Sequence, residues 1–139
     1  MPHQIYEFAV IDSKGRIVIP ATIRKALNIS DGMRIILIAD LDNREIRIIP
    51  LADVYAEVYQ LRIMMDDKPG VLAKVASILS ENRVDLLLTE SRTIKRGLSA
   101  EWNIIADFTE CKIGADKLID SIKKLDFVRE VEVKKITLR

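Results

Sequence analysis

The pattern of hydrophobic and polar positions changes near residue 57 of the 139-residue chain. Before that point, short β-branched runs alternate with turn residues, which is typical of several small strands with little helix. The turn residues at 12–15 end in a glycine, so they predict a tight connection between two of the strands. The strands expected from this pattern are 8–11, 16–19, 33–39 and 45–50.

One short helix is predicted among these strands, over residues 21–27. Pro20 suits the start of a helix, and Ile23, Ala26 and Leu27 follow at the i, i+3, i+4 spacing of an apolar stripe. We expect this stripe to face the core. A unit of about 50 residues with one helix buries too little surface to be stable alone, so we also expect a dimer.

Beyond residue 57, strand patterns alternate with two amphipathic helices. Strands are expected at 60–64, 84–94, 98–108 and 128–136. The two helical stripes are Val71, Leu72, Val75, Ile78 and Leu79, then Ala115, Leu118, Ile119, Ile122 and Leu125. The order is βαββαβ, which predicts an antiparallel sheet with both helices on one face and an α+β fold class. Residues 51–56 contain no Gly or Pro, so we expect a short connection between the halves.

Charge and hydropathy restrict the possible partners. The chain has 22 Lys and Arg against 21 Asp and Glu, a net charge of +1, so any basic surface must be local. No apolar run approaches the roughly 20 residues that span a bilayer. The N-terminus lacks the pattern of a signal peptide, and we expect a cytoplasmic protein without membrane contact.

The inventory of reactive side chains argues against catalysis. The single Cys111 and single His3 cannot form an internal disulfide, a zinc cage or a plausible nucleophilic pair. No combination of nucleophile, base and orienting group stands out, and no phosphate-binding loop occurs. We therefore expect a protein that is not an enzyme and has no cofactor or metal.

Residues 11–29 carry a specific motif: a charged turn, then Gly15 to Pro20 reading Gly-Arg-Ile-Val-Ile-Pro, then a helix with two adjacent basic residues. This order resembles the AbrB/SpoVT/MazE-like motif. The resemblance implies a dimeric swapped-hairpin β-barrel over residues 1–52, which binds DNA or, in antitoxins, both DNA and a toxin. One departure is Ala9-Val10, where family members often have a basic pair. The DNA-binding residues expected here are Lys14, Arg16, Arg24 and Lys25.

The local charge supports this interpretation independently. Five basic and two acidic side chains lie between Asp12 and Arg34, an excess of three positive charges that a dimer doubles. Arg can pair with a phosphate or contact guanine, and Lys acts mainly as a point charge on the backbone. The alternative is that these side chains only form solvated surfaces of a helix and a strand.

Residues 57–137 resemble an ACT domain, a small-molecule sensor that usually binds amino acids at a dimer interface; we place the domain at 57–139. The sequence Asp-Lys-Pro-Gly-Val-Leu at 67–72, between a strand and a helix, carries the resemblance. It implies that Gly70 lets a ligand approach the backbone, and that the N–H groups of Val71 and Leu72 hold a carboxylate. It also implies that Asp67 and Asp85 fall at positions where amino-acid-binding members contact the ligand's polar groups.

The two aspartates allow more than one interpretation. As ligand contacts they favour an ammonium group, or a basic ligand, over a neutral one. Alternatively, Asp67 is a turn residue or helix cap, and Asp85 is a turn residue that leads into a strand.

These features predict a DNA-binding transcriptional regulator whose DNA binding or assembly responds to an amino acid at ACT-domain interfaces. Its expected partners are DNA, further copies of the chain in a homodimer or higher oligomer, and the effector. The alternative is an interaction module, antitoxin-like or a regulatory subunit, that binds a protein partner and senses an amino acid.

Overall fold

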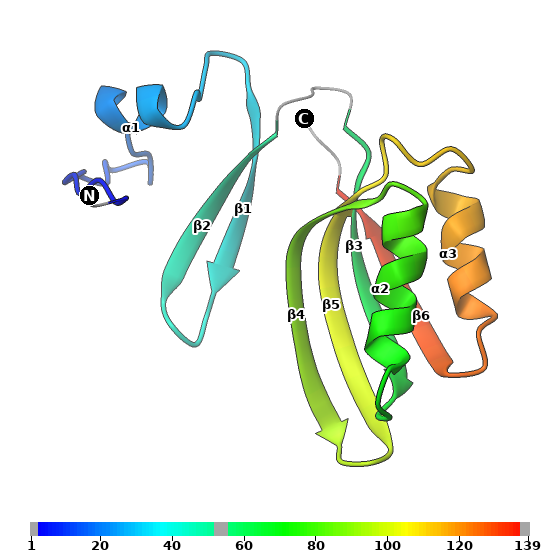
Figure 1. Cartoon of the computed structure of the whole chain (residues 1–139). Coiled ribbons are helices and arrows are strands. Elements are labelled where there is room, and N and C mark those ends of the chain that lie inside the picture. The colour runs from blue at the N-terminus through cyan, green and yellow to red at the C-terminus, as the bar shows by residue number, and fades with distance from the viewer. Residues whose placement is uncertain (1–2, 52–55, 137–139) are drawn as a thin grey trace. The chain divides into compact units, whose positions relative to one another are not determined.

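The computed structural model describes residues 3–51 and 56–136. The chain divides into two compact units, residues 1–52 and 53–139 (Figure 1). Most of the connection expected at 51–56 lies outside the described residues.

The second unit contains one four-stranded antiparallel sheet and two helices. Its elements are β3 (Val58–Asp66), α2 (Val71–Glu81), β4 (Asp85–Lys95), β5 (Ser99–Asp107), α3 (Ala115–Lys123) and β6 (Val128–Lys135). The strand order is β4-β5-β3-β6, and both helices cover the same face of the sheet (Figure 1). The predicted βαββαβ order and antiparallel sheet are confirmed.

The core of this unit lies between the sheet and the helices. Alternate residues of β3 and β5, such as Ile63 and Ile104, point toward the helices and are almost fully buried. Val75 of α2 and Ile122 of α3 pack against them. The predicted stripes therefore supply the helical side of the core. Leu72 is the exception, because on the first turn of α2 it stays 38% exposed and does not join the core cluster.

The first unit contains α1 (Ala21–Ala26) and a hairpin of β1 (Arg34–Asp40) with β2 (Glu45–Leu51). The hairpin is confirmed, but the strands expected at 8–11 and 16–19 are absent from the described chain. A strand needs a neighbouring strand, and these segments pair with none beyond the turn, where the N–H of Asp12 donates to the carbonyl of Arg16 at 3.0 Å.

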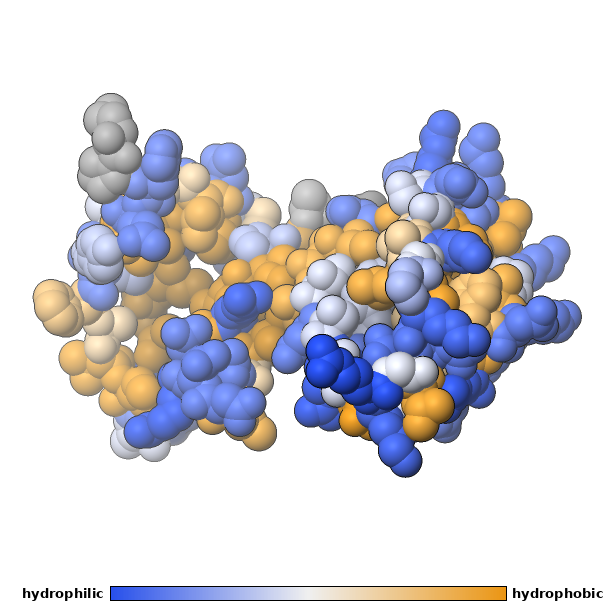
Figure 2. Space-filling view, turned by 60° about the horizontal axis from the view of Figure 1, so that its bottom comes forward, coloured by the Kyte–Doolittle hydropathy of each residue, from blue (hydrophilic) through white to orange (hydrophobic). Residues whose placement is uncertain are grey.

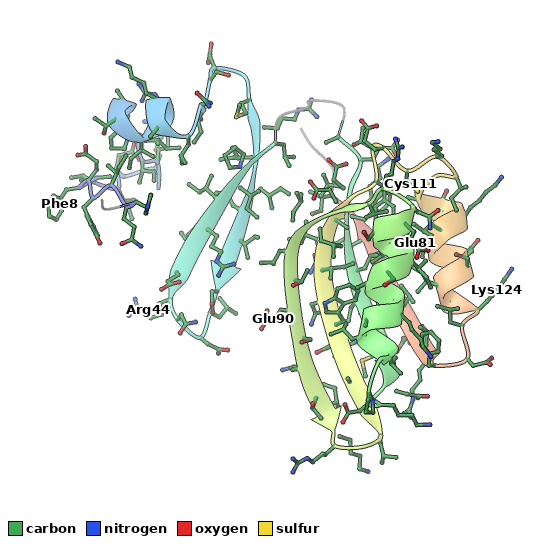
Figure 3. The ribbon with its side chains drawn as sticks, viewed as in Figure 1. Phe8, Arg44, Glu81, Glu90, Cys111 and Lys124 are labelled. Carbon is green, nitrogen blue, oxygen red and sulfur yellow. The ribbon has the colours of Figure 1, made fainter. Side chains whose placement is uncertain are left out.

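The first unit buries little of its apolar surface. No residue of α1 is buried and Leu27 is 56% exposed, so the stripe predicted to face a core meets none in this chain. Figure 2 shows hydrophobic side chains over the surface of this unit, and Figure 3 shows Phe8 projecting from the chain. The large apolar side chains that are exposed here include Tyr6, Phe8, Val10, Ile11, Val18, Leu37, Leu41 and Ile46.

Candidate functional sites

Asp12 organises the turn that carries two of the predicted DNA-binding residues. Its Oδ1 accepts the backbone N–H groups of Lys14 and Arg16, each at 2.9 Å, and its Oδ2 accepts Arg16 Nε at 2.8 Å. The backbone N–H of Arg16, followed by its side chain, lowers the pKa of the Asp12 carboxyl. The carboxylate therefore holds Arg16 in place, while that side chain remains 71% exposed.

The other two predicted DNA-binding residues lie in the last turn of α1. Arg24 donates from Nη1 to the carbonyl of Ile19, which ties the helix to the segment before it. Arg24 and Lys25 line a shallow hollow of about 460 Å³ together with Asn28 and Ser30. Arg24 and Lys25 thus present basic groups on one surface beside polar side chains.

The structure brings the four basic residues together in two pairs. Lys14 and Arg16 share the Asp12 carboxylate, and Arg24 and Lys25 share the hollow. Among residues 3–51, no ion pair or hydrogen bond joins one pair to the other. Both pairs are solvent-exposed, as contacts to phosphate groups require.

In the ACT-like unit, Asp67 connects two loops. Its Oδ2 accepts the N–H of Gly97 at 2.8 Å, and its own N–H donates to the carbonyl of Leu98 at 3.2 Å. Asp67 is not a helix cap, since Gly70 holds the cap position of α2 and no side chain caps the helix. Gly70 has φ of 85°, a left-handed conformation that other residues adopt only at a cost.

The backbone donors predicted at the start of α2 differ in availability. The N–H of Val71 already donates to the carbonyl of Lys68 at 3.3 Å. The N–H of Leu72 donates to no backbone carbonyl outside the helix in the described part of the chain. Leu72 is therefore the better placed of the two to hold a ligand carboxylate.

Asp67 and Asp85 lie at opposite ends of the sheet. Asp85 opens β4 and pairs with Asp107, which in turn pairs with Val58 at the start of β3. Asp67 follows the last residue of β3. The length of a nine-residue strand thus separates the two carboxylates within one chain. One chain does not bring them together around one ligand.

Asp67 instead lines a hollow of about 280 Å³ between the β3–α2 loop, the first turn of α2 and β4. Sequence reasoning missed its residues on β4, Ser91 and Thr93. Their pairing with Trp102 and Ala100 places them on the helix-covered face of the sheet. The alternation along the strand could have shown that Ser91 and Thr93 share one face of the sheet. Their proximity to Asp67, however, depends on how the strands pair.

A buried carboxylate, that of Glu101, lies on the opposite face of the sheet. The sequence analysis did not predict it. The Glu101 side chain is only 3% exposed, and it accepts Arg62 Nε with one oxygen and Arg92 Nε, at 2.8 Å, with the other. Arg62 also donates to Glu132 at 3.1 Å. The hydrogen bond from Arg62 lowers the pKa of Glu101 although burial opposes it, and Arg92 adds to the effect.

Two family models match the chain. The model described as "ACT domain" matches residues 59–127, and the model described as "Antidote-toxin recognition MazE, bacterial antitoxin" matches residues 9–55. The chain therefore joins a MazE/AbrB-like domain to an ACT domain, as the motifs predicted. The combination supports a regulatory, ligand-sensing role.

Solved structures resemble part of the chain at low sequence identity. A homoserine dehydrogenase from Thiobacillus denitrificans is 21% identical with a TM-score of 0.46, over 58% of this chain and 17% of that chain. The ACT domain of a GTP pyrophosphokinase from Chlorobium tepidum is 18% identical with a TM-score of 0.46, over 57% and 99%. The C-terminal domain of MgtC from Mycobacterium tuberculosis is 17% identical with a TM-score of 0.47, over 61% and 93%. No curated protein matches the chain.

Two features are absent from the described residues. Within 3–51 and 56–136, no helix is both long and apolar enough to cross a membrane. In the same ranges, no group of three or more His, Cys, Asp or Glu side chains is arranged to hold a metal ion.

Proposed function

We propose that the chain is a DNA-binding transcriptional regulator in which an amino acid at the ACT domain changes DNA binding or assembly. One observation carries this proposal: the MazE/AbrB-like unit exposes basic groups and also has almost no core of its own. The function is regulatory and not catalytic.

The exposed apolar side chains of the first unit support a swapped-hairpin dimer. Phe8 and Val10 are 102% and 86% exposed, in segments whose sequence predicts strands. A second copy can supply both the missing neighbouring strands and the missing core. Burying a side chain of this kind stabilises the assembly by about 1.5–3 kcal/mol, so interleaving two chains is strongly favoured.

The same dimer concentrates positive charge for DNA. The local excess of three positive charges becomes six when two copies combine. Arg24 and Lys25 contact the phosphate backbone or base edges, and Lys14 and Arg16 extend the basic surface at the neighbouring turn. The proposed DNA interface therefore consists of these four basic residues.

The ACT domain provides the regulatory input. A ligand changes DNA affinity only through its different affinities for two states of the protein. The proposal therefore requires two arrangements of the dimer, or of a higher oligomer, of which one binds DNA more tightly. The effector acts by stabilising one of them.

A second candidate function follows from the match to the MazE model, whose description names recognition of a toxin. In this alternative, the first unit binds a protein partner and the ACT domain still senses an amino acid. The exposed apolar side chains of the unit then serve partly to bind that protein.

A salt titration of DNA binding by fluorescence anisotropy tests the regulator proposal, with the parent, Arg24→Ala and Arg16→Ala. Each phosphate that the protein no longer neutralises flattens the slope of log K against log salt by about 0.9, and a substitution acts twice in a symmetric dimer. Arg96→Ala, an exposed arginine in the β4–β5 connection, is the matched control and keeps the parental slope. Parental binding by both test variants at every salt concentration would show that the DNA site is wrongly assigned.

A further inference from the structure

A second hollow, of about 400 Å³, runs along α2 and shares no residue with the hollow that Asp67 lines. Phe127, in the connection from α3 to β6, forms one part of it. The rest consists of α2 residues that follow one another at steps of three and four, so they form a continuous stripe on one side of the helix. These residues are Ala73, Lys74, Ser77, Ile78 and Glu81.

This stripe lies on a different side of α2 from the one that packs into the core. The buried residues of the helix are Val71, Val75 and Leu79. Most of the stripe is exposed, and Ile78 is half-buried at the border of the core. Its small Ser77, near the middle, leaves room for another helix to approach closely. The stripe is therefore a helix side without a partner among the described residues of the chain.

The stripe has a positive charge near one end and a negative charge near the other. Lys74 and Glu81, labelled in Figure 3, are two helical turns apart, a rise of about 10 Å. Within 3–51 and 56–136, no ion pair includes either side chain. The Lys74 ammonium lies 5.6 Å from the centroid of the Phe127 ring, which holds it beside the hollow.

This arrangement of charges is self-complementary. A second α2 that runs antiparallel, related by a two-fold axis between positions 77 and 78, brings Lys74 to the partner's Glu81 and Glu81 to the partner's Lys74. The same axis brings Ser77 to the partner's Ser77. A parallel pair in register would instead place like charges together. The stripe thus fits a second copy of itself in one orientation.

We propose that this side of α2 is a contact between the ACT domains of two chains, with antiparallel helices paired through Lys74 and Glu81. Exposed ion pairs contribute little free energy, so they set the orientation, while Ile78 and Phe127 of both copies lose exposed apolar area. The contact goes beyond the swapped-hairpin dimer, because it lies in the other unit of the chain.

Disulfide cross-linking of the full chain tests the arrangement. The two-fold axis places position 77 close to its counterpart, so Ser77→Cys should form a disulfide between two chains on mild oxidation. Cys111→Ser removes the native thiol from this variant. Asp120→Cys, at an exposed position of α3 in the same Cys111→Ser background, is the matched control. We expect the first variant to run mainly as a cross-linked pair on a non-reducing gel and the control mainly as a single chain. Equal cross-linking of the two would overturn the contact.

Charge reversal in the Ser77→Cys, Cys111→Ser background tests the pairing. Lys74→Glu or Glu81→Lys alone places like charges together and should slow cross-linking at least about tenfold. The two reversals combined restore both pairs and should restore the rate, whereas Lys117→Glu on α3 should leave it unchanged. Thermal melts by circular dichroism confirm that each variant folds.

Two results of this experiment would overturn the antiparallel pairing. One is a cross-linking rate that neither single reversal changes, and the other is a rate that the double reversal does not restore. DNA binding is measured separately, by the salt titration above, so failure of this contact and failure of the regulator proposal are distinguishable.

Discussion

Replacing Glu101 by glutamine is expected to destabilise the ACT domain more than any other change of a single acidic residue on the same sheet face. Both oxygens of Glu101 accept hydrogen bonds from arginine side chains, and the side chain is 3% exposed. A glutamine at this position would present an N–H₂ group to one of these donors in place of an acceptor. The variant therefore has one charge-assisted hydrogen bond fewer, and a donor faces a donor.

The solvent exposure of the two arginines limits the loss in free energy of unfolding. Removing one member of a fully buried ion pair costs about 3–5 kcal/mol. Here the side chains of Arg62 and Arg92 are 38% and 68% exposed, so water can solvate the cations that lose their partner. We expect Glu101→Gln to lower the free energy of unfolding by about 2 kcal/mol, below the fully buried case.

Urea denaturation at pH 7, monitored by Trp102 fluorescence, measures this effect. Glu132→Gln is the matched control, because Glu132 also pairs with Arg62 on the same sheet face but is 57% exposed. An exposed pair of this kind contributes about 0–1 kcal/mol. Equal destabilisation by the two substitutions would refute the argument that burial makes the Glu101 pair important.

The loss of stability in Glu101→Gln is also expected to depend on pH. The folded state lowers the pKa of Glu101, so its stabilising contribution is fully present above the unfolded pKa of about 4.3 and is lost as the pH falls through the folded pKa. The difference in unfolding free energy between parent and Glu101→Gln should therefore shrink below about pH 4. A difference that stays constant from pH 7 to pH 3 would contradict the assigned ion pairs.

Three further substitutions test other parts of the account. Phe8→Ser removes an apolar side chain that the proposed dimer buries, and sedimentation should show weaker self-association; an unchanged dissociation constant would argue against burial of Phe8. Gly70→Ala places a Cβ at φ of 85° without a steric clash, so urea denaturation should show a loss of about 1–2 kcal/mol from backbone conformation alone. Leu118→Ala empties a core position that is 1% exposed and should cost about 2–5 kcal/mol in the same assay, whereas a loss below about 1 kcal/mol would show that α3 packs loosely.

The ACT domain could be predicted from the sequence because its local patterns agree with its tertiary packing. The stripe from Ala115 to Ile122 becomes the buried face of α3, and the alternation from Trp102 to Phe108 becomes the buried face of β5 and the residue that follows it. In both segments, one period of hydrophobic positions defines one buried surface. Leu72 departs from its stripe because its side chain lines the hollow, whereas the neighbouring Val71 packs into the core.

The first unit shows where one sequence is insufficient. The strand patterns at 8–11 and 16–19 find no neighbouring strand in a single chain, and the stripe of α1 finds no core. In the proposed dimer, a second copy supplies the neighbouring strands and the core that these patterns predict.

The candidate ligand site was predicted only in part. Asp67, Gly70 and Leu72 come from one continuous motif and lie near one another. The position of β4 residues relative to Asp67 depends on strand register, which a single sequence does not fix. Ser91 was therefore missed, and the separation of Asp85 from Asp67 within one chain could not be foreseen.

The most direct test of the central proposal is a salt titration of the full chain on a pool of short DNA duplexes, with and without a millimolar mixture of amino acids. The proposal predicts binding that weakens steeply with salt, since counterions are released from the phosphate backbone, and that shifts in affinity when the mixture is present. Absence of binding at low salt in both conditions would contradict a DNA-binding regulator and favour a protein partner for the first unit.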